Sequence, residues 1–329
     1  MKDWKNYAKL AVTLTILAII FRRLDWHAFA RELGNMQLAW LLAGFACIGA
    51  STVTQAVRWR YLLRVQQVNP TLTLTWLIVM IGQFFNQFLP GSVGGDVIKA
   101  WYIVRQTPNL KERAVLAVLL DRVLGLVAVL FMTLALIPLQ FEKIAADHHA
   151  RLIIGALAAL LVGVFLGFAL LWLVPLRKLP PGCRRLWQKM PKREIFESLY
   201  VGFHEHGKNL RLTLAAVGFA IISVGFVLST GYLIGRAFEL DISYAQMTII
   251  FAIVLCAIAL PFTLSGHGLR EWAFLTLFPM FAVTRHGQPV GAATALACST
   301  VFLALTLLWA AIGGAVYLLY SHRLKKIEP

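Results

Sequence analysis

The chain has 329 residues, of which 59% are hydrophobic and 14% are charged, and its formal net charge is +16 at pH 7. This composition excludes a soluble globular domain and indicates a polytopic membrane protein. Apolar runs of about 18 or more residues recur and alternating ten-residue segments are absent, so the sequence predicts an all-α polytopic membrane protein and not a β-barrel.

Basic residues and cysteines exclude several other classes. The Lys and Arg residues lie in short segments that flank apolar runs, a pattern typical of membrane orientation and not of nucleic-acid binding. Cys47, Cys256 and Cys298 fall in apolar segments and Cys183 lies alone in a basic loop. Neither a disulfide framework nor metal-ligand spacing is present, so we expect no metal site and no cofactor.

The apolar segments, in chain order, suggest two similar halves within a single integral membrane domain over residues 1–329. They cover residues 7–21, 38–57, 72–89, 97–104, 114–141, 152–175, 212–238, 244–262, 269–281 and 290–320. The first is a retained helix, because a signal-peptide cleavage site does not follow it. We expect about six full transmembrane helices plus two broken pairs, with a first repeat at 38–141, a basic cytoplasmic loop with an amphipathic helix at 176–211, and a second repeat at 212–320.

Positive charge predicts the orientation of these segments. Residues 176–193 carry seven Lys and Arg residues and no acid, which indicates a cytoplasmic loop. The same rule places the N- and C-termini in the cytoplasm of a bacterial inner membrane. The broken pairs then form two oppositely oriented re-entrant hairpins in an inverted-repeat architecture, although full spans in place of the second hairpin would have the same end points.

The first broken pair contains a Gly-rich turn at membrane depth, GQFFNQFLPGSVGGDVIKAWY over residues 82–102. Irregular backbone is tolerated there only when it is buried in protein or lines a cavity. The candidate residues are Asn86, Pro90, Gly91, Gly94, Gly95, Asp96 and Lys99. Asp96 either caps the helix that follows or helps to form an anion site at the helix start, with Lys99 as the counter-charge. Gln83, Asn86 and Gln87 form a polar face that lines a cavity or makes bonds between helices.

The second broken pair, ALPFTLSGHGLREWAF over residues 259–274, is a weaker copy of the first. Its candidate residues are Pro261, Gly266, His267, Gly268, Arg270 and Glu271. Ionisable side chains in apolar segments are expensive and therefore indicate functional sites or structural ion pairs. His267 is interpreted mainly as a hydrogen-bonded turn residue.

Asp121 and Arg122 form a further candidate pair within an apolar segment. Neighbouring residues point about 100 degrees apart on a helix, so each is expected to have a different partner. Arg122 is predicted to meet Asp96, Glu271 or a bound anion, and Arg270 and Glu271 are expected to behave likewise. Arg58 to Tyr61 is interpreted as a positively charged aromatic segment at the membrane interface.

FFNQFLPGSVGGDVIKAW, VLLDRVLGL and ALPFTLSGHGLREWAF resemble the lysylphosphatidylglycerol synthase transmembrane, or flippase-like, family over nearly the whole chain. The resemblance implies an inner-membrane protein that moves lipids or lipid-linked sugars. A fused synthase domain does not follow, so we expect no enzyme activity. The motif positions carried over are Asn86, Pro90, Gly91, Gly94, Gly95, Asp96, Lys99, Asp121, Arg122, Pro261, Gly266, Gly268 and Glu271. His267 departs from the family pattern, since a glycine is expected there.

These features predict translocation of an anionic phospholipid or a polyprenyl-phosphate-linked lipid between leaflets. One alternative is a non-transporting membrane partner of a glycosyltransferase that uses lipid-linked sugars, and another is a small-solute secondary transporter. A lipid flippase requires a groove that opens sideways to the bilayer, whereas a solute carrier requires a closed aqueous path. The sequence does not indicate the oligomeric state.

Overall fold

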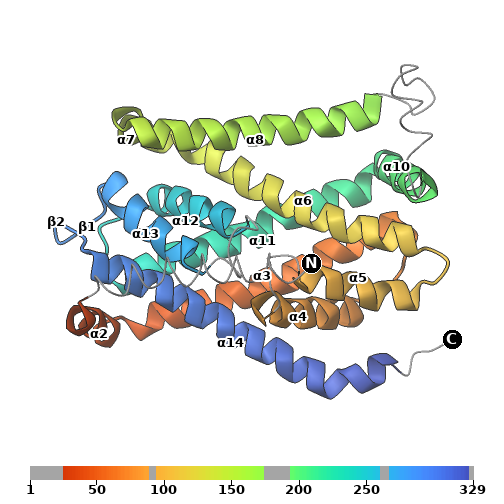
Figure 1. The fold of residues 1–329 in the computed structure, drawn as a ribbon, viewed down its shortest axis with the longest axis horizontal. Helices are drawn as coiled ribbons and strands as arrows, with labels where there is room; N and C mark the ends of the chain where they lie inside the picture. Colours follow the sequence, from red (N-terminus) through yellow and green to blue (C-terminus); the bar gives the residue numbers. More distant parts are fainter. Residues whose placement is uncertain (1–24, 89–93, 174–192, 260–266, 326–329) are drawn as a thin grey trace, which may run out of the picture.

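The computed structural model describes residues 25–88, 94–173, 193–259 and 267–325 (Figure 1). The elements are α2 (Trp26–Gly34), α3 (Leu38–Val65), α4 (Leu72–Phe88), α5 (Gly94–Gln106), α6 (Lys111–Leu136), η1 (Ile137–Gln140), α7 (Phe141–Ala146), α8 (His148–Leu173), α10 (Arg193–Lys208), α11 (Leu210–Ala237), α12 (Tyr244–Ala259), α13 (Leu269–Met280), β1 (Thr284–Arg285), β2 (Gln288–Pro289) and α14 (Ala292–Lys325). The helix expected at 7–21 lies outside these residues.

Five helices within the described ranges are long and apolar enough to cross a membrane: Leu38–Val65, Lys111–Gln140, His148–Gly167, Leu210–Ala237 and Ala292–Tyr320. Each corresponds to a span predicted from the sequence. The expectation of an all-α polytopic membrane protein is therefore confirmed.

Helices α3 and α11 pack along most of their length and form the centre of the bundle. Small polar side chains join them: the Ser51 and Ser223 hydroxyls lie 3.1 Å apart and Thr230 Oγ1 donates to the Gly44 carbonyl at 3.5 Å. Helix α14 crosses this pair, and Trp309 Nε1 donates to the Phe45 carbonyl at 2.8 Å. Close approach through small residues and hydrogen bonds is the usual way in which helices associate in lipid.

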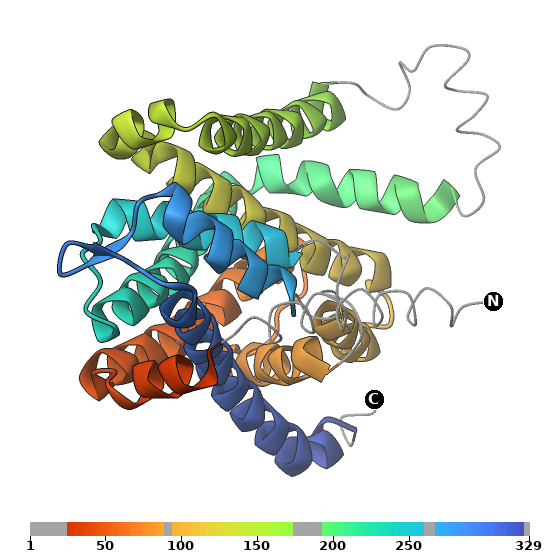
Figure 2. The same cartoon turned by 60° about the vertical axis from the view of Figure 1, so that its left-hand side comes forward.

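Two pairs of shorter helices pack against opposite ends of the long helices (Figures 1 and 2). Helices α4 and α5 contain 17 and 13 residues, and α12 and α13 contain 16 and 12. At about 1.5 Å per residue, none reaches the roughly 30 Å of a hydrocarbon core. The residues that join each pair, 89–93 and 260–266, lie outside the described ranges.

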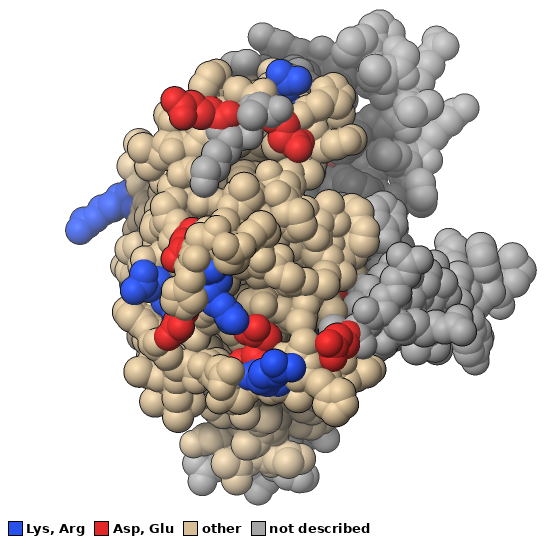
Figure 3. Space-filling view, turned by 90° about the vertical axis from the view of Figure 1, so that its left-hand side faces the viewer, with Lys and Arg blue, Asp and Glu red and all other residues tan. Residues whose placement is uncertain are grey.

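The two ends of the bundle differ in charge. One end, called the basic end below, contains the last turns of α3 and α5 and the starts of α6 and α11, with Arg60, Arg64, Arg105, Lys111, Arg113 and Arg211. At the opposite end, called the mixed end, Lys, Arg, Asp and Glu are interspersed over a largely uncharged surface (Figure 3). The start of α4 and the end of α5 lie at the basic end, and the start of α12 and the end of α13 lie at the mixed end.

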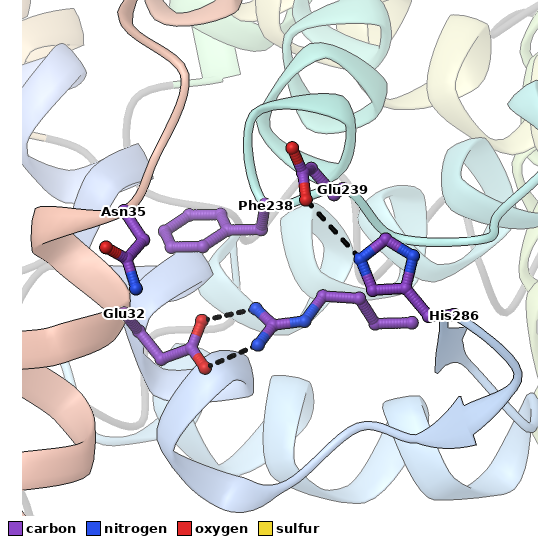
Figure 4. Close-up of a pocket in the computed structure, with 6 residues that line it drawn as sticks. Glu32, Asn35, Phe238, Glu239 and His286 are labelled. Carbon is purple, nitrogen blue, oxygen red and sulfur yellow. Dashed lines mark hydrogen bonds and ion pairs between the residues drawn. The ribbon is translucent and has the colours of Figure 1, made fainter.

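The mixed end contains a polar clamp that the sequence did not predict. Arg285 of β1 forms a bidentate pair with Glu32 of α2, with N–O distances of 2.7 and 3.1 Å, and His286 Nε2 lies 3.5 Å from Glu239 (Figure 4). Asp25 caps α2 by accepting from the amides of His27 and Ala28. The clamp lines a cavity of about 260 Å³ and connects segments that are 253 residues apart.

Helix α10 is the amphipathic helix predicted after the basic loop, and it packs against α6 and α11. Gln66, which follows the last residue of α3, contacts α10: its Nε2 donates to the Gly202 carbonyl at 2.8 Å and lies 3.0 Å from His206 Nε2. Burial lowers the pKa of His206 from its usual 6.5 to about 4. The ring is therefore neutral at physiological pH, as acceptance of a hydrogen bond from Gln66 requires.

Candidate functional site

Asp121 of α6 lies between two buried cations from different helices. Arg58 Nε of α3 donates to Oδ1 at 2.7 Å, and Lys99 Nζ of α5 donates to Oδ2 at 2.9 Å. The side chains of Arg58, Lys99 and Asp121 are 3%, 5% and 2% exposed. One carboxylate thus joins three helices within an apolar interior.

Asp96 and Arg122 extend this arrangement toward the surface. Arg122 of α6 donates to Asp96 Oδ2 at 2.7 Å, and Lys99 Nζ lies 3.4 Å from Asp96 Oδ1. The side chains of Asp96 and Arg122 are 17% and 35% exposed. We call Arg58, Asp96, Lys99, Asp121 and Arg122 the ion network; Lys99 connects its buried part to its accessible part.

The ion network contains three basic and two acidic side chains. Electrostatic interactions are stronger in this low-dielectric setting than in water. The ring of Trp59, whose centroid is 5.1 Å from Lys99 Nζ, adds a weak cation–π contact but no formal charge. The excess of positive charge makes the accessible end, at Arg122, suited to an anion.

The start of α5 is held by Asn86, not by Asp96. The Gly95 amide donates to Asn86 Oδ1 at 2.7 Å, so the side chain of α4 satisfies a free amide at the helix start. Asp96 lies in the first turn of α5 and its carboxylate faces Lys99 and Arg122. The N-cap interpretation of Asp96 is wrong, because it requires a helix that begins at Val97, and α5 begins three residues earlier, at Gly94.

Gln83 belongs to the polar face of α4, which was expected either to line a cavity or to make hydrogen bonds between helices. Its Nε2 donates to Thr52 Oγ1 of α3 at 2.9 Å. Together with the Asn86 bond, this contact shows that two residues of that face join neighbouring helices.

The second cluster lies on α13 and α14. Arg270 pairs with the adjacent Glu271 and donates through Nε to Ser299 Oγ at 2.9 Å. Separate partners for Arg270 and Glu271 were expected, and that prediction is wrong, because the long arginine side chain bends back within the first turn. The Gly268 amide donates to Glu271 Oε2 at 2.7 Å, and Gly268 has a φ of 83° that favours glycine. Glu271 therefore stabilises the start of its own helix.

The site residues predicted from the sequence thus form two clusters, one on α5 and α6 and one at the start of α13. His267 is half-buried beside Gly268. Pro90, Gly91, Pro261 and Gly266 lie outside the described residues. Asp121 and Arg122 have different partners, as predicted, and Asp96 is the partner of Arg122.

Arg58 is the functional candidate that the sequence interpretation missed. It was assigned to the membrane interface, but its side chain is 3% exposed and bound to Asp121, so that interpretation is wrong. Helix α3 continues to Val65, which places Arg58 inside the span and not at its end. The available signal was that apolar residues, Leu62, Leu63 and Val65, continue the helix beyond Arg58, although Arg60 and Arg64 lie among them.

Comparison with known proteins decides the family. The sequence matches the family described as the lysylphosphatidylglycerol synthase TM region over residues 6–314. The chain belongs to this family. It is also 29% identical over 171 residues to a UPF0104 membrane protein of Pyrococcus horikoshii, an alignment that covers 49% of this chain and 48% of that protein. The chain thus spans about half the length of this curated relative, and the resemblance carried by the three motifs is confirmed.

Proposed function

We propose that this member of the lysylphosphatidylglycerol synthase TM-region family moves an anionic lipid, a phospholipid or a polyprenyl-phosphate-linked lipid, between membrane leaflets. The observation that carries the proposal is the ion network, in which Arg122 is accessible and connects through Asp96 and Lys99 to buried charges. Such an arrangement is rare at membrane depth unless it serves a substrate or ion pathway.

In this proposal a lipid phosphate competes with Asp96 for Arg122. Asp96 already lies 3.4 Å from Lys99, so it retains a cationic partner when the phosphate takes its place on the guanidinium. Arginine binds phosphate through two parallel N–H donors, which favours this exchange over simple attraction. The apolar chains stay in the bilayer while the headgroup crosses, and no covalent step is involved.

The helix pairs support a matching architecture. Both α4–α5 and α12–α13 are too short to cross and enter from opposite ends, as expected for opposed re-entrant hairpins in an inverted repeat. The positive charge at the basic end supports an orientation in which that end faces the cytoplasm of a bacterial inner membrane. The ion network then lies on the cytoplasmic half of the path and the Arg270–Glu271 pair on the other half.

Arg122→Gln tests the role of the ion network. Loss of one charged phosphate partner, worth about 1.5 to 3 kcal/mol, should slow leaflet exchange of fluorescent phosphatidylglycerol in reconstituted liposomes by at least about tenfold. Arg64→Gln is the control, because Arg64 is exposed at the basic end and this substitution removes the same charge.

Equal exchange rates of the two variants at equal reconstitution would contradict the assignment. Uptake of a water-soluble anion by the unaltered protein, without lipid exchange, would favour the small-solute transporter. No transport of either kind would favour a non-transporting partner of a glycosyltransferase.

A further inference from the structure

A groove of about 450 Å³ runs along α5 between α4 and α14, apart from the residues of the ion network. Its wall is formed by Val97 and Trp101 of α5, Phe85 of α4 and Tyr317 of α14. The rings of Phe85 and Tyr317 meet edge to face at 5.3 Å between centroids. Val97 and Trp101 are 60% and 41% exposed, so the groove opens sideways from the bundle.

The groove has one charged residue, at the basic end. The Arg105 guanidinium lies 4.2 Å from the centroid of the Trp101 ring. A stacked guanidinium keeps the N–H groups at its edge available to an anion. Among the side chains that the structure describes, none forms an ion pair with Arg105.

The groove is thus apolar toward the middle of the bundle and cationic at the end of α5. Asp96 precedes Val97, so the inner end of the groove adjoins the ion network. The nine residues from Asp96 to Arg105 correspond to about 14 Å along the helix. A lipid that lies parallel to α5 would have its phosphate at Arg105, at the basic end, and its chains toward the middle of the bundle. This is the orientation of a lipid in the leaflet on the side of the basic end.

We propose that this groove holds a single anionic lipid before translocation, with the phosphate on Arg105 and one apolar chain against Val97, Trp101 and Tyr317. The inference rests on the proposed function, because it supplies the entry site from which the headgroup passes to Arg122. The positive charge of Arg105 and the apolar wall select for a lipid whose headgroup has a net negative charge over a zwitterionic lipid, in which a cation offsets the phosphate.

Photo-crosslinking tests the occupant directly. Benzoylphenylalanine is placed at Val97, or at Leu318 of α14, which is 73% exposed, and the protein is reconstituted in phosphatidylcholine with a minor fraction of phosphatidylglycerol. Mass spectrometry of the adducts at Val97 should show phosphatidylglycerol enriched about fivefold over its share of the bilayer, the effect of one basic residue near an anionic lipid. Adducts at Leu318 should reflect the bulk composition.

Arg105→Gln in the Val97 crosslinker protein should remove the enrichment, whereas Arg64→Gln at the same end should leave it. Enrichment that persists without Arg105, adducts at the bulk ratio, or crosslinks to the chain's own residues 1–24 would each overturn the proposal. Leaflet exchange measured in the same liposomes separates the two hypotheses. Exchange without enrichment rejects only the groove, and enrichment without exchange rejects only the transport function.

Discussion

At the residue scale, Asp121 is the side chain on which the buried part of the ion network depends. It is the carboxylate that neutralises both Arg58 and Lys99, which come from helices that precede it in the chain. Replacing a complete buried ion pair by apolar residues is often harmless, but removing one partner leaves an uncompensated charge. Asp121 therefore has a larger effect on stability than any exposed acid of this protein.

Asp121→Asn should destabilise the protein by about 3 to 5 kcal/mol, because Arg58 loses its carboxylate partner in an apolar interior and Lys99 keeps only the longer contact to Asp96. The measurement is the thermal unfolding midpoint in detergent, followed by tryptophan fluorescence. Glu205→Gln is the control, since Glu205 pairs with Lys208, which is 70% exposed. A midpoint for Asp121→Asn equal to that of Glu205→Gln would show that the buried contacts contribute nothing to stability.

Residue partners were predictable from the sequence only where local geometry constrains them. The separation of Asp121 and Arg122 onto different partners follows from the 100-degree turn between neighbours. The contact between Arg58 and Asp121 joins residues 63 positions apart, and local pattern contains no information on which helix faces which. The Arg270–Glu271 pair was missed because a flexible side chain can bend back over a fixed backbone.

At the element scale, the α4–α5 pair depends on close backbone contact. A Cβ atom on Gly95 would meet the Gly82 carbonyl of α4 and lie 2.6 Å from Asn86 Cγ. The absence of a side chain at Gly95 thus allows Asn86 to reach the α5 amide and brings Lys99 over Gly82. The position of Lys99 in the ion network therefore depends on the close packing of α4 against α5.

Gly95→Ala should separate α4 from α5, destabilise the protein by about 1 to 3 kcal/mol and reduce lipid exchange, because overpacked contacts must shift. Gly163→Ala in α8 is the matched control, since a Cβ there meets nothing within 4 Å. That control should be neutral or slightly stabilising, as alanine is favoured over glycine in a helix. Identical unfolding midpoints for the two variants would rule out the close contact between α4 and α5.

At the scale of the whole molecule, the spans were predictable because long apolar runs depend on composition alone. The clamp at the mixed end was not. Helix α2 has only nine residues, and its partner Arg285 lies 253 positions away in a two-residue strand. Neither the length of α2 nor any local motif indicates that contact.

The two ends of the bundle should face opposite sides of the membrane, with the basic end inside. In a background in which Cys47, Cys183, Cys256 and Cys298 are replaced by serine, single cysteines are placed at Asn69 and Asn109, which flank α4–α5, and at Gln288 of β2. All three positions are exposed.

A membrane-impermeant maleimide should label Gln288→Cys in intact cells, and Asn69→Cys and Asn109→Cys only after permeabilisation, because Lys and Arg are retained in the cytoplasm. Labelling of Asn69→Cys and Asn109→Cys from opposite sides would exclude a hairpin that enters and leaves at one surface. Labelling of Asn109→Cys and Gln288→Cys from the same side would exclude the opposed arrangement of α4–α5 and α12–α13, and with it a path that runs from one helix pair to the other.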